Sequence, residues 1–314
     1  MTKVQTRAVK KRFWSKDDTE LTVMALPSFI WYVLFCFIPM FGVILAFKDY
    51  RISGNFFKSM WDSAWVGINN FKFIFASPDI WMIIRNTLGY NAVFIVLNIV
   101  VPVILAIIIS QLRSKRMGKI YQTAMFLPYF LSWVVISSLV WAFLSYERGL
   151  FNRMITDVGG EAVQWYMKKE FWPGFLVFMN LWKSLGYSMV IYLAAITGLD
   201  VSYYEAAVID GASRLQQARF ITVPLLKTVI ILMFILAVGR IFYADFGLFY
   251  QVPRDSNTLY NQVYVIDVYV YKMLLNSTTG MASAAAALQA VVGCVTILTA
   301  NWIVRKVDPE SAMM

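Results

Sequence analysis

The chain has 314 residues, of which 60% are hydrophobic and 17% are aromatic, whereas only 15% are charged. A soluble domain carries about 25% charged residues, so this composition predicts a membrane protein. The number of soluble domains can therefore not be inferred from the chain length. The net charge of +10 does not point to nucleic acid. No basic face with interleaved aromatic residues stands out, and basic flanks of membrane spans explain the excess.

Histidine is absent, and the two cysteines, Cys36 and Cys294, both lie within apolar runs. Zinc sites, Cys-His nucleophiles and disulfide frameworks all require more of these residues or closer spacing. The sequence therefore predicts no metal site and no catalytic site of these kinds.

Apolar runs and polar intervals predict an all-α, polytopic membrane protein with six transmembrane helices inside residues 24–304. A basic arm (1–23) precedes this domain and a short tail (305–314) follows it. Proline is expected to bend the first and third spans, at Pro27, Pro39 and Pro128. In chain order the spans are 24–47, 88–110, 120–144, 173–197, 225–249 and 281–304.

Lysine and arginine are nearly twice as dense in one set of connecting segments as in the other. The positive-inside rule then predicts that both termini and residues 198–224 are cytoplasmic, and that 48–81, 145–172 and 250–280 lie outside. Within the last of these segments, 260–275 is expected to be a short helix on the membrane surface or on a partner subunit.

The cytoplasmic segment 198–224 has a distinctive pattern. Glu205-Ala206-Ala207 is followed after three residues by Gly211, and Pro224 closes the segment. Glutamate and alanine favour helix, Gly211 suits a positive φ at a helix end, and Pro224 suits the first turn of a second helix. An ordinary loop between two membrane helices would explain the same residue types.

The pattern resembles the cytoplasmic loop of carbohydrate-type ABC importer permeases, including the polysaccharide-permease branch. It departs from them at Val223, where leucine is usual, and at Leu215 and Ala218, where aromatics are common. The resemblance implies a type I ABC importer permease fold in a bacterial cytoplasmic membrane. It also implies that the loop docks onto an ATPase subunit through Tyr204, Glu205, Ala206, Ala207, Asp210, Gly211, Ala212 and Pro224.

The family further implies a second permease subunit forming a heterodimer, two ATPase subunits and an extracytoplasmic solute-binding protein. The cargo would be a sugar or oligosaccharide. This chain has no Gly-x-x-x-x-Gly-Lys-Ser/Thr phosphate loop. ATP and magnesium would therefore be used by the partner ATPase, and this chain would be a transport subunit without a cofactor or an enzymatic activity of its own.

Polar residues inside the spans are candidates for the cargo pathway, because such residues usually face a bundle interior or a water-filled cavity. Helical spacing places those of the fourth span on one face, and those of the second and fifth spans could share a cavity with them. Snorkelling, pairing with Asp245 and hydrogen bonds between helices explain the same residues equally well. The candidates are Asn180, Lys183, Ser184 and Tyr187, then Arg240, Tyr243 and Asp245, with Asn91 and Asn98.

Three other functions stay open at this point. The chain could be an ABC permease for another class of solute, which cargo binding by its partner would reveal. It could be an ion-driven secondary transporter, although of the acidic residues only Asp245 approaches mid-membrane. It could also be a membrane scaffold or receptor, which would keep its function without an ATPase.

Overall fold

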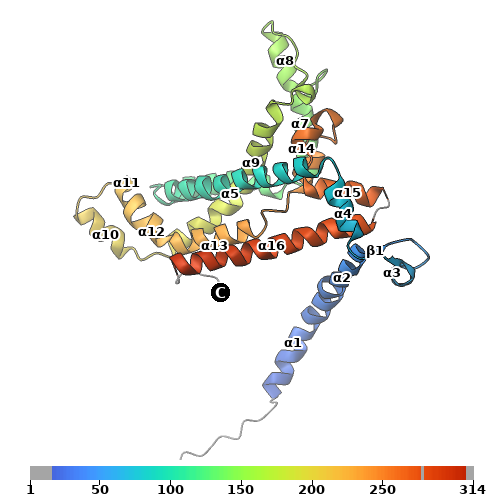
Figure 1. Cartoon of the computed structure of the whole chain (residues 1–314). Coiled ribbons are helices and arrows are strands. Elements are labelled where there is room, and N and C mark those ends of the chain that lie inside the picture. Colours follow the sequence, from blue (N-terminus) through green and yellow to red (C-terminus); the bar gives the residue numbers. More distant parts are fainter. Residues whose placement is uncertain (1–15, 277–278, 309–314) are drawn as a thin grey trace, which may run out of the picture.

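In the computed structural model, the described residues are 16–276 and 279–308, and nearly all their regular structure is helical (Figure 1). Within these ranges, four helical segments are long and apolar enough to cross a membrane, and the number rises to six if each of two bent helix pairs forms one span. The four are residues 17–47, α5 (Ile80–Ser110), α9 (Phe171–Thr197) and α16 (Thr279–Val307). The prediction of an all-helical membrane protein is therefore confirmed.

Several short elements connect these helices. β1 and β2 pair antiparallel, and α8 (Leu150–Asp157) lies at the tip of a projection in Figure 1. The short elements before α5 are β1 (Lys48–Asp49), α3 (Phe56–Asp62), β2 (Ala64–Trp65) and α4 (Asn69–Ala76), and those after α8 include η4 (Trp165–Met167) and η7 (Asn257–Leu259).

The first span points away from the rest of the chain (Figure 1). It comprises α1 (Lys16–Tyr32), the π-turn η1 (Val33–Phe37), α2 (Ile38–Met40) and the 3-10 segment η2 (Phe41–Phe47). Only its last part packs on α16 and α4. Large apolar side chains of α1 are exposed, with Met24 at 78%. This span therefore needs lipid or another protein around it.

Two prolines follow π-turns at the same offset. Pro39 comes two residues after η1, and Pro224 comes two residues after η5 (Ala218–Thr222). Proline lacks an N–H, and its ring clashes with the carbonyl four residues earlier in a regular helix. A wider π-turn moves that carbonyl away, so the helix continues past the proline.

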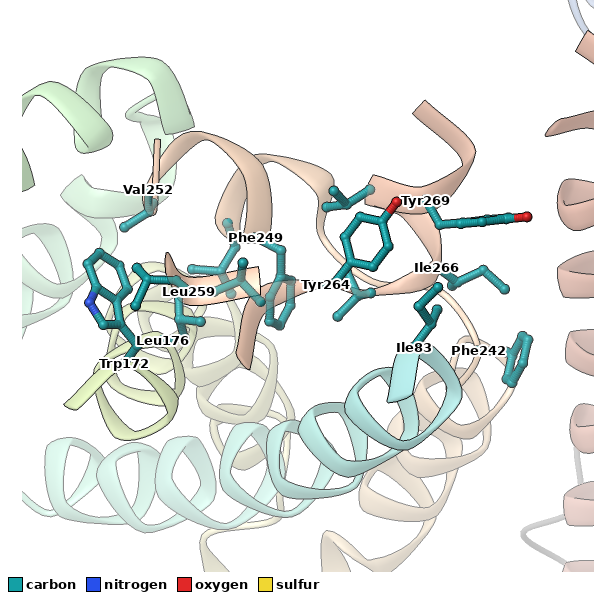
Figure 2. Close-up of a cluster of buried hydrophobic side chains, with 14 of the residues drawn as sticks. Ile83, Trp172, Leu176, Phe242, Phe249, Val252, Leu259, Tyr264, Ile266 and Tyr269 are labelled. Atoms are coloured by element: carbon teal, nitrogen blue, oxygen red, sulfur yellow. The ribbon is translucent and has the colours of Figure 1, made fainter. Parts of the chain in front are cut away.

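The main apolar core joins the first halves of α5 and α9 to the chain between Phe242 and Tyr269. Figure 2 shows Trp172 and Leu176 beside Val252 and Leu259, with Ile83 closer to Tyr264 and Ile266. Trp172 is fully buried, and its indole N–H donates to the Trp165 carbonyl at 3.0 Å, which satisfies its polar edge. A second cluster, which includes Met189 and Leu226, joins the other halves of α5 and α9 to α13 (Lys227–Val238).

The predicted third span, 120–144, is not straight. α6 (Lys115–Phe126) and η3 (Leu127–Phe130) meet α7 (Trp133–Leu144) at 99°. Leu131 and Ser132 are extended, and the Ser132 hydroxyl caps α7 by accepting from the Val135 N–H. Pro128 was expected to bend the chain, but the break falls three residues later because the capped residue begins a new helix.

The prediction of one continuous helix over 225–249 is wrong. The short helices α11 (Arg214–Gln217), η5 and α12 (Val223–Leu225) meet α13 at 59°, and α13 then ends at Val238. Residues 239–245 are unwound, and the π-turn η6 (Gly247–Gln251) begins after the helical residue Phe246. Hydrophobicity alone could not show this, because the partners of the unwound backbone lie on other helices.

The segment 260–275 also differs from its prediction. It forms α14 (Tyr260–Val263) and α15 (Ile266–Leu275), which are separated by two residues and packed into the core instead of lying on a membrane surface. Val265 and Ile266 are fully buried, and the Ile266 N–H donates to the Thr87 hydroxyl at 3.1 Å. An amphipathic pattern does not distinguish a membrane surface from the surface of the same protein.

Candidate functional site

A cavity of about 600 Å³ lies between α5, α9 and the end of α13. Its walls mix apolar side chains with amides, hydroxyls, one guanidinium and one carboxylate. The lining residues are Asn91, Phe94, Ile95, Asn98, Ile99, Asn180, Ser188, Tyr192, Met233, Ala237, Arg240, Tyr243, Ala244, Asp245 and Phe246. The unwound segment after α13 thus forms one wall of the cavity.

Six of the predicted pathway residues line this cavity: Asn91, Asn98, Asn180, Arg240, Tyr243 and Asp245. Asn98 and Asn180 join α5 to α9, since the Asn98 amide donates to the Asn180 side-chain oxygen at 2.9 Å. The Ser184 hydroxyl donates back to the Asn98 side-chain oxygen at 2.9 Å. Ser184 therefore supports the wall without belonging to the lining.

Lys183 and Tyr187 lie outside the lining. The Lys183 ammonium donates to the carbonyl oxygens of Tyr129 and Leu131, which the bend between η3 and α7 leaves without helical partners. The Tyr187 ring stacks on Tyr129 with centroids 4.8 Å apart. Both side chains of α9 thus hold the bend of the third span.

Trp133 connects that bend to the unwound segment. Its ring lies 5.2 Å from the Lys183 ammonium, and its indole N–H donates to Asp245 at 2.7 Å. The other Asp245 oxygen accepts from the N–H groups of Gly247 and Leu248. A Cβ on Gly247 would lie 2.1 Å from the Trp133 ring, so glycine is required there. Lys183 and Asp245 are therefore bridged by Trp133.

We expect Trp133→Phe to keep the ring contacts and to lose the hydrogen bond to Asp245. Because Asp245 is exposed to solvent, the cost should be about 1 kcal/mol and not the penalty of a buried unpaired group. Thermal unfolding in detergent measures it. Trp61→Phe, at an exposed position in α3, is the control, and equal melting temperatures for the two variants would contradict the role of this hydrogen bond.

The unwound segment is held by polar side chains from three other helices. The Asn91 amide donates to the carbonyls of Ile241 and Tyr243, both at 2.8 Å. Asp267 on α15 accepts from the Ala244 N–H, and Gln289 on α16 donates to the Phe242 carbonyl. Burial raises the pKa of Asp267, although the hydrogen bonds from Ala244 and Gln289 oppose that shift.

Sequence reasoning missed Asp267 and Gln289 as partners of the segment. A signal existed, since Gln289 is an amide inside the apolar run of the sixth span and Asp267 follows Val265 and Ile266. Polar residues in such runs face partners more often than lipid. The identity of the partner could not be predicted, because the unwound segment itself was expected to be helical.

The loop 198–224 lies at the far end of the bundle, where α10 and α11 appear together at the left of Figure 1. α10 (Ser202–Ile209) contains Glu205, Ala206 and Ala207. Gly211 has φ +80°, as predicted, and turns the chain toward α11. Ser213 begins α11 with a reciprocal capping box to Gln216. Pro224 differs from its prediction, since it lies near the end of the helical run Arg214–Leu225 and not at the start of a new helix.

The loop is braced on one side and exposed on the other. The hydroxyls of Tyr204 and Thr222 lie 3.0 Å apart, and Gln111 and Arg214 exchange side-chain to carbonyl hydrogen bonds, both at 3.2 Å. Glu205, Ala206, Asp210 and Gly211 are exposed, whereas Ala207 and Ala212 are half-buried. Ile209 is 85% exposed and Leu215 79% exposed. The exposed surface of the loop therefore carries two large apolar side chains beside the carboxylates of Glu205 and Asp210.

Residues 98–309 match the family model described as binding-protein-dependent transport system inner membrane component. The chain is 33% identical over 291 residues to the polygalacturonan/rhamnogalacturonan transport system permease protein YteP of Bacillus subtilis (strain 168), covering 92% of this chain and 89% of that one.

Two solved structures are similar to almost the whole chain. One is a bacterial alginate ABC transporter in complex with its alginate pentasaccharide-bound periplasmic protein, with a TM-score of 0.81, 31% identity, and 93% of this chain and 96% of that chain covered. The other is a bacterial ABC transporter involved in the import of the acidic polysaccharide alginate, with the same TM-score and identity, and 93% and 97% covered.

Proposed function

Because the chain belongs to the family of binding-protein-dependent transport system inner membrane components, we propose that it is the permease subunit of an ATP-driven oligosaccharide importer. The observation that carries this proposal is the exposed loop 198–224. Large apolar side chains at a helical turn, here Ile209 and Leu215, are costly in water unless a protein partner covers them. The partner that fits is an ATPase subunit with a groove for α10.

The rest of the assembly follows from the same proposal. A second permease subunit of different sequence, two ATPase subunits and an extracytoplasmic solute-binding protein complete the importer. Both termini and the loop lie on the cytoplasmic side, in agreement with the density of Lys and Arg. ATP binding closes the ATPase pair, the loop moves with it, and the helices switch between inward-facing and outward-facing packings.

The cavity suits a sugar. The Asn180 N–H2 group can donate hydrogen bonds to sugar hydroxyls, the Asn91 side-chain oxygen can accept them, and Tyr243 offers an aromatic face. The buried Tyr192 hydroxyl has no hydrogen-bond partner among the described residues. Such a group is expected to meet water or a ligand.

An acidic oligosaccharide is favoured over a neutral one. None of the ion pairs in the described part of the chain includes Arg240, whose guanidinium lines the cavity. A guanidinium binds a carboxylate through paired hydrogen bonds. The names of the similar proteins mention polygalacturonan and alginate, and both are polymers of sugar acids.

Uptake in proteoliposomes that contain the complete importer tests this proposal. We expect transport of a short oligogalacturonate and little transport of a neutral malto-oligosaccharide of the same length. Arg240→Gln should raise the KM for the acidic substrate about tenfold, because a charge-assisted hydrogen bond contributes more than a neutral one, while Arg240→Lys should retain part of the affinity. Equal uptake of both sugars, or an unchanged KM in Arg240→Gln, would contradict the acidic cargo.

A further inference from the structure

Residues 239–245 interrupt the helical structure between α13 and η6, so their backbone polar groups need partners. Local turns supply some of them, since the N–H groups of Arg240, Ile241 and Tyr243 donate to carbonyls three residues earlier. The remaining groups include the carbonyls of Ile241, Phe242 and Tyr243 and the N–H of Ala244. Each of these is bonded to a side chain from another helix.

These side chains come from three helices, α5, α15 and α16, and hold the segment by hydrogen bonds. Asn91 belongs to the cavity wall. Asp267 on α15 and Gln289 on α16 lie outside the lining: Asp267 accepts from the Ala244 N–H at 2.6 Å, and Gln289 donates to the Phe242 carbonyl at 3.1 Å and to Asp267 at 3.2 Å. The two residues thus bind each other and the segment at once.

These hydrogen bonds determine which side chains of the segment face the cavity. Phe242 is only 6% exposed and packs in the apolar core, whereas its neighbour Tyr243 lines the cavity with Arg240. Figure 2 shows Phe242 near Ile266 at the edge of that core. A rotation of the segment would exchange these positions, and it would first have to break the bonds at Phe242 and Ala244.

Asp267 and Gln289 lie on helices that other contacts hold in place. Gln289 is 3% exposed, and α15 is tied to α5 through the bond from Ile266 to Thr87. α16 meets the end of α13 closely, since a Cβ on Gly293 would lie 2.9 Å from the Gly239 carbonyl. Anchors on such fixed elements hold a site more precisely than loop residues do.

We propose that Asp267 and Gln289 are positioning residues, which hold the unwound segment in the rotation that presents Arg240 and Tyr243 to the cavity. Their effect on import rests on the proposed function, but their effect on the cavity wall does not. The geometry can therefore be tested without any transport measurement.

The test measures how fast a water-soluble, charged maleimide modifies a single cysteine in the purified full-length protein. Cys36 and Cys294 are first replaced by serine and alanine, and Tyr243→Cys is introduced as the probe. Ser188→Cys, on the α9 wall of the same cavity, is the matched control. Asp267→Ala removes the acceptor, whereas Asp267→Asn keeps an oxygen that can accept from Ala244.

We expect Asp267→Ala to change the labelling rate at position 243 about tenfold, since an unmade buried hydrogen bond shifts an equilibrium by that order. Asp267→Asn should restore the original rate, and the rate at position 188 should not change. Unchanged labelling at position 243 in Asp267→Ala, or equal changes at both positions, would overturn the proposal.

If Asp267→Ala does not yield monodisperse protein, Gln289→Met decides the question, because it removes the donor to Phe242 and keeps an unbranched side chain of similar length. The same selective change at position 243 is then expected, and its absence overturns the proposal. A result against positioning leaves the importer proposal intact. A failure of oligosaccharide uptake, in turn, leaves the labelling result valid.

Discussion

Glu205→Lys should abolish ATP-driven uptake while the protein still inserts into the membrane and folds. Glu205 is exposed in the first turn of α10, where its carboxylate favours the helix N-terminus by only about 0.3–1 kcal/mol, which is too little to decide folding. The family resemblance implies that this carboxylate meets a positive charge on the ATPase. Like charges facing each other across an interface cost several kcal/mol, which weakens docking by roughly a hundredfold or more.

Two measurements separate docking from folding. Co-purification from native membranes in mild detergent should recover an ATPase and a second permease with the unaltered chain, and should lose the ATPase with the variant. Size-exclusion profiles of the two chains alone should agree. Glu161→Lys, an identical charge reversal at an exposed position outside the loop, is the control. Normal uptake by Glu205→Lys, or recovery of the chain without any ATPase in either form, would contradict docking through this loop.

The loop and the fold class could be predicted from sequence because both depend on local patterns. Helix propensity places Glu205 to Ala207 in α10, and the need for a positive φ at the turn places Gly211. Apolar runs of sufficient length likewise predict α5, α9 and α16. These inferences need only the residues of one segment and their spacing.

The details of the cavity depend on contacts between segments, and these were not predictable. Lys183 was a pathway candidate by helical spacing, yet it binds carbonyls at the bend of another span. The break at 239–245 is stable only because Asn91, Asp267 and Gln289 supply partners from elsewhere in the chain. A hydropathy pattern records that a segment is apolar, but it does not record which of its peptide groups another helix will bind.

Gly186 allows Lys183 to reach that bend. After Glu205→Lys, replacement of this glycine should have the second largest effect among the substitutions predicted for this protein. Gly186 lies on α9 one turn after Lys183, where α9 approaches the end of α6 closely. A Cβ built there would lie 2.2 Å from the Met125 carbonyl oxygen and 2.5 Å from the Phe126 Cα. Both neighbours are backbone atoms, so a side-chain rotation cannot relieve the clash.

We therefore expect Gly186→Ala to push α9 away from the bend, at a cost of about 1–3 kcal/mol or more. The displacement should also weaken the bonds from Lys183 to Tyr129 and Leu131, and through Trp133 the contact with Asp245. Gly174→Ala is the matched control, because it lies in the same helix with no atom within 4 Å of its Cβ position. Alanine there should leave stability unchanged or raise it by about 0.5–1 kcal/mol, since glycine is the poorer helix former.

Thermal unfolding of both variants in detergent measures the difference, which should have opposite signs for the two positions on one helix. Loss of stability at Gly186 alone would show that close backbone approach, and not helix propensity, determines how α9 lies against the bent span. Similar melting temperatures for the two variants would mean that α6 and α9 can separate without cost. The bond from Lys183 to the bend would then be a consequence of the packing and not one of its supports.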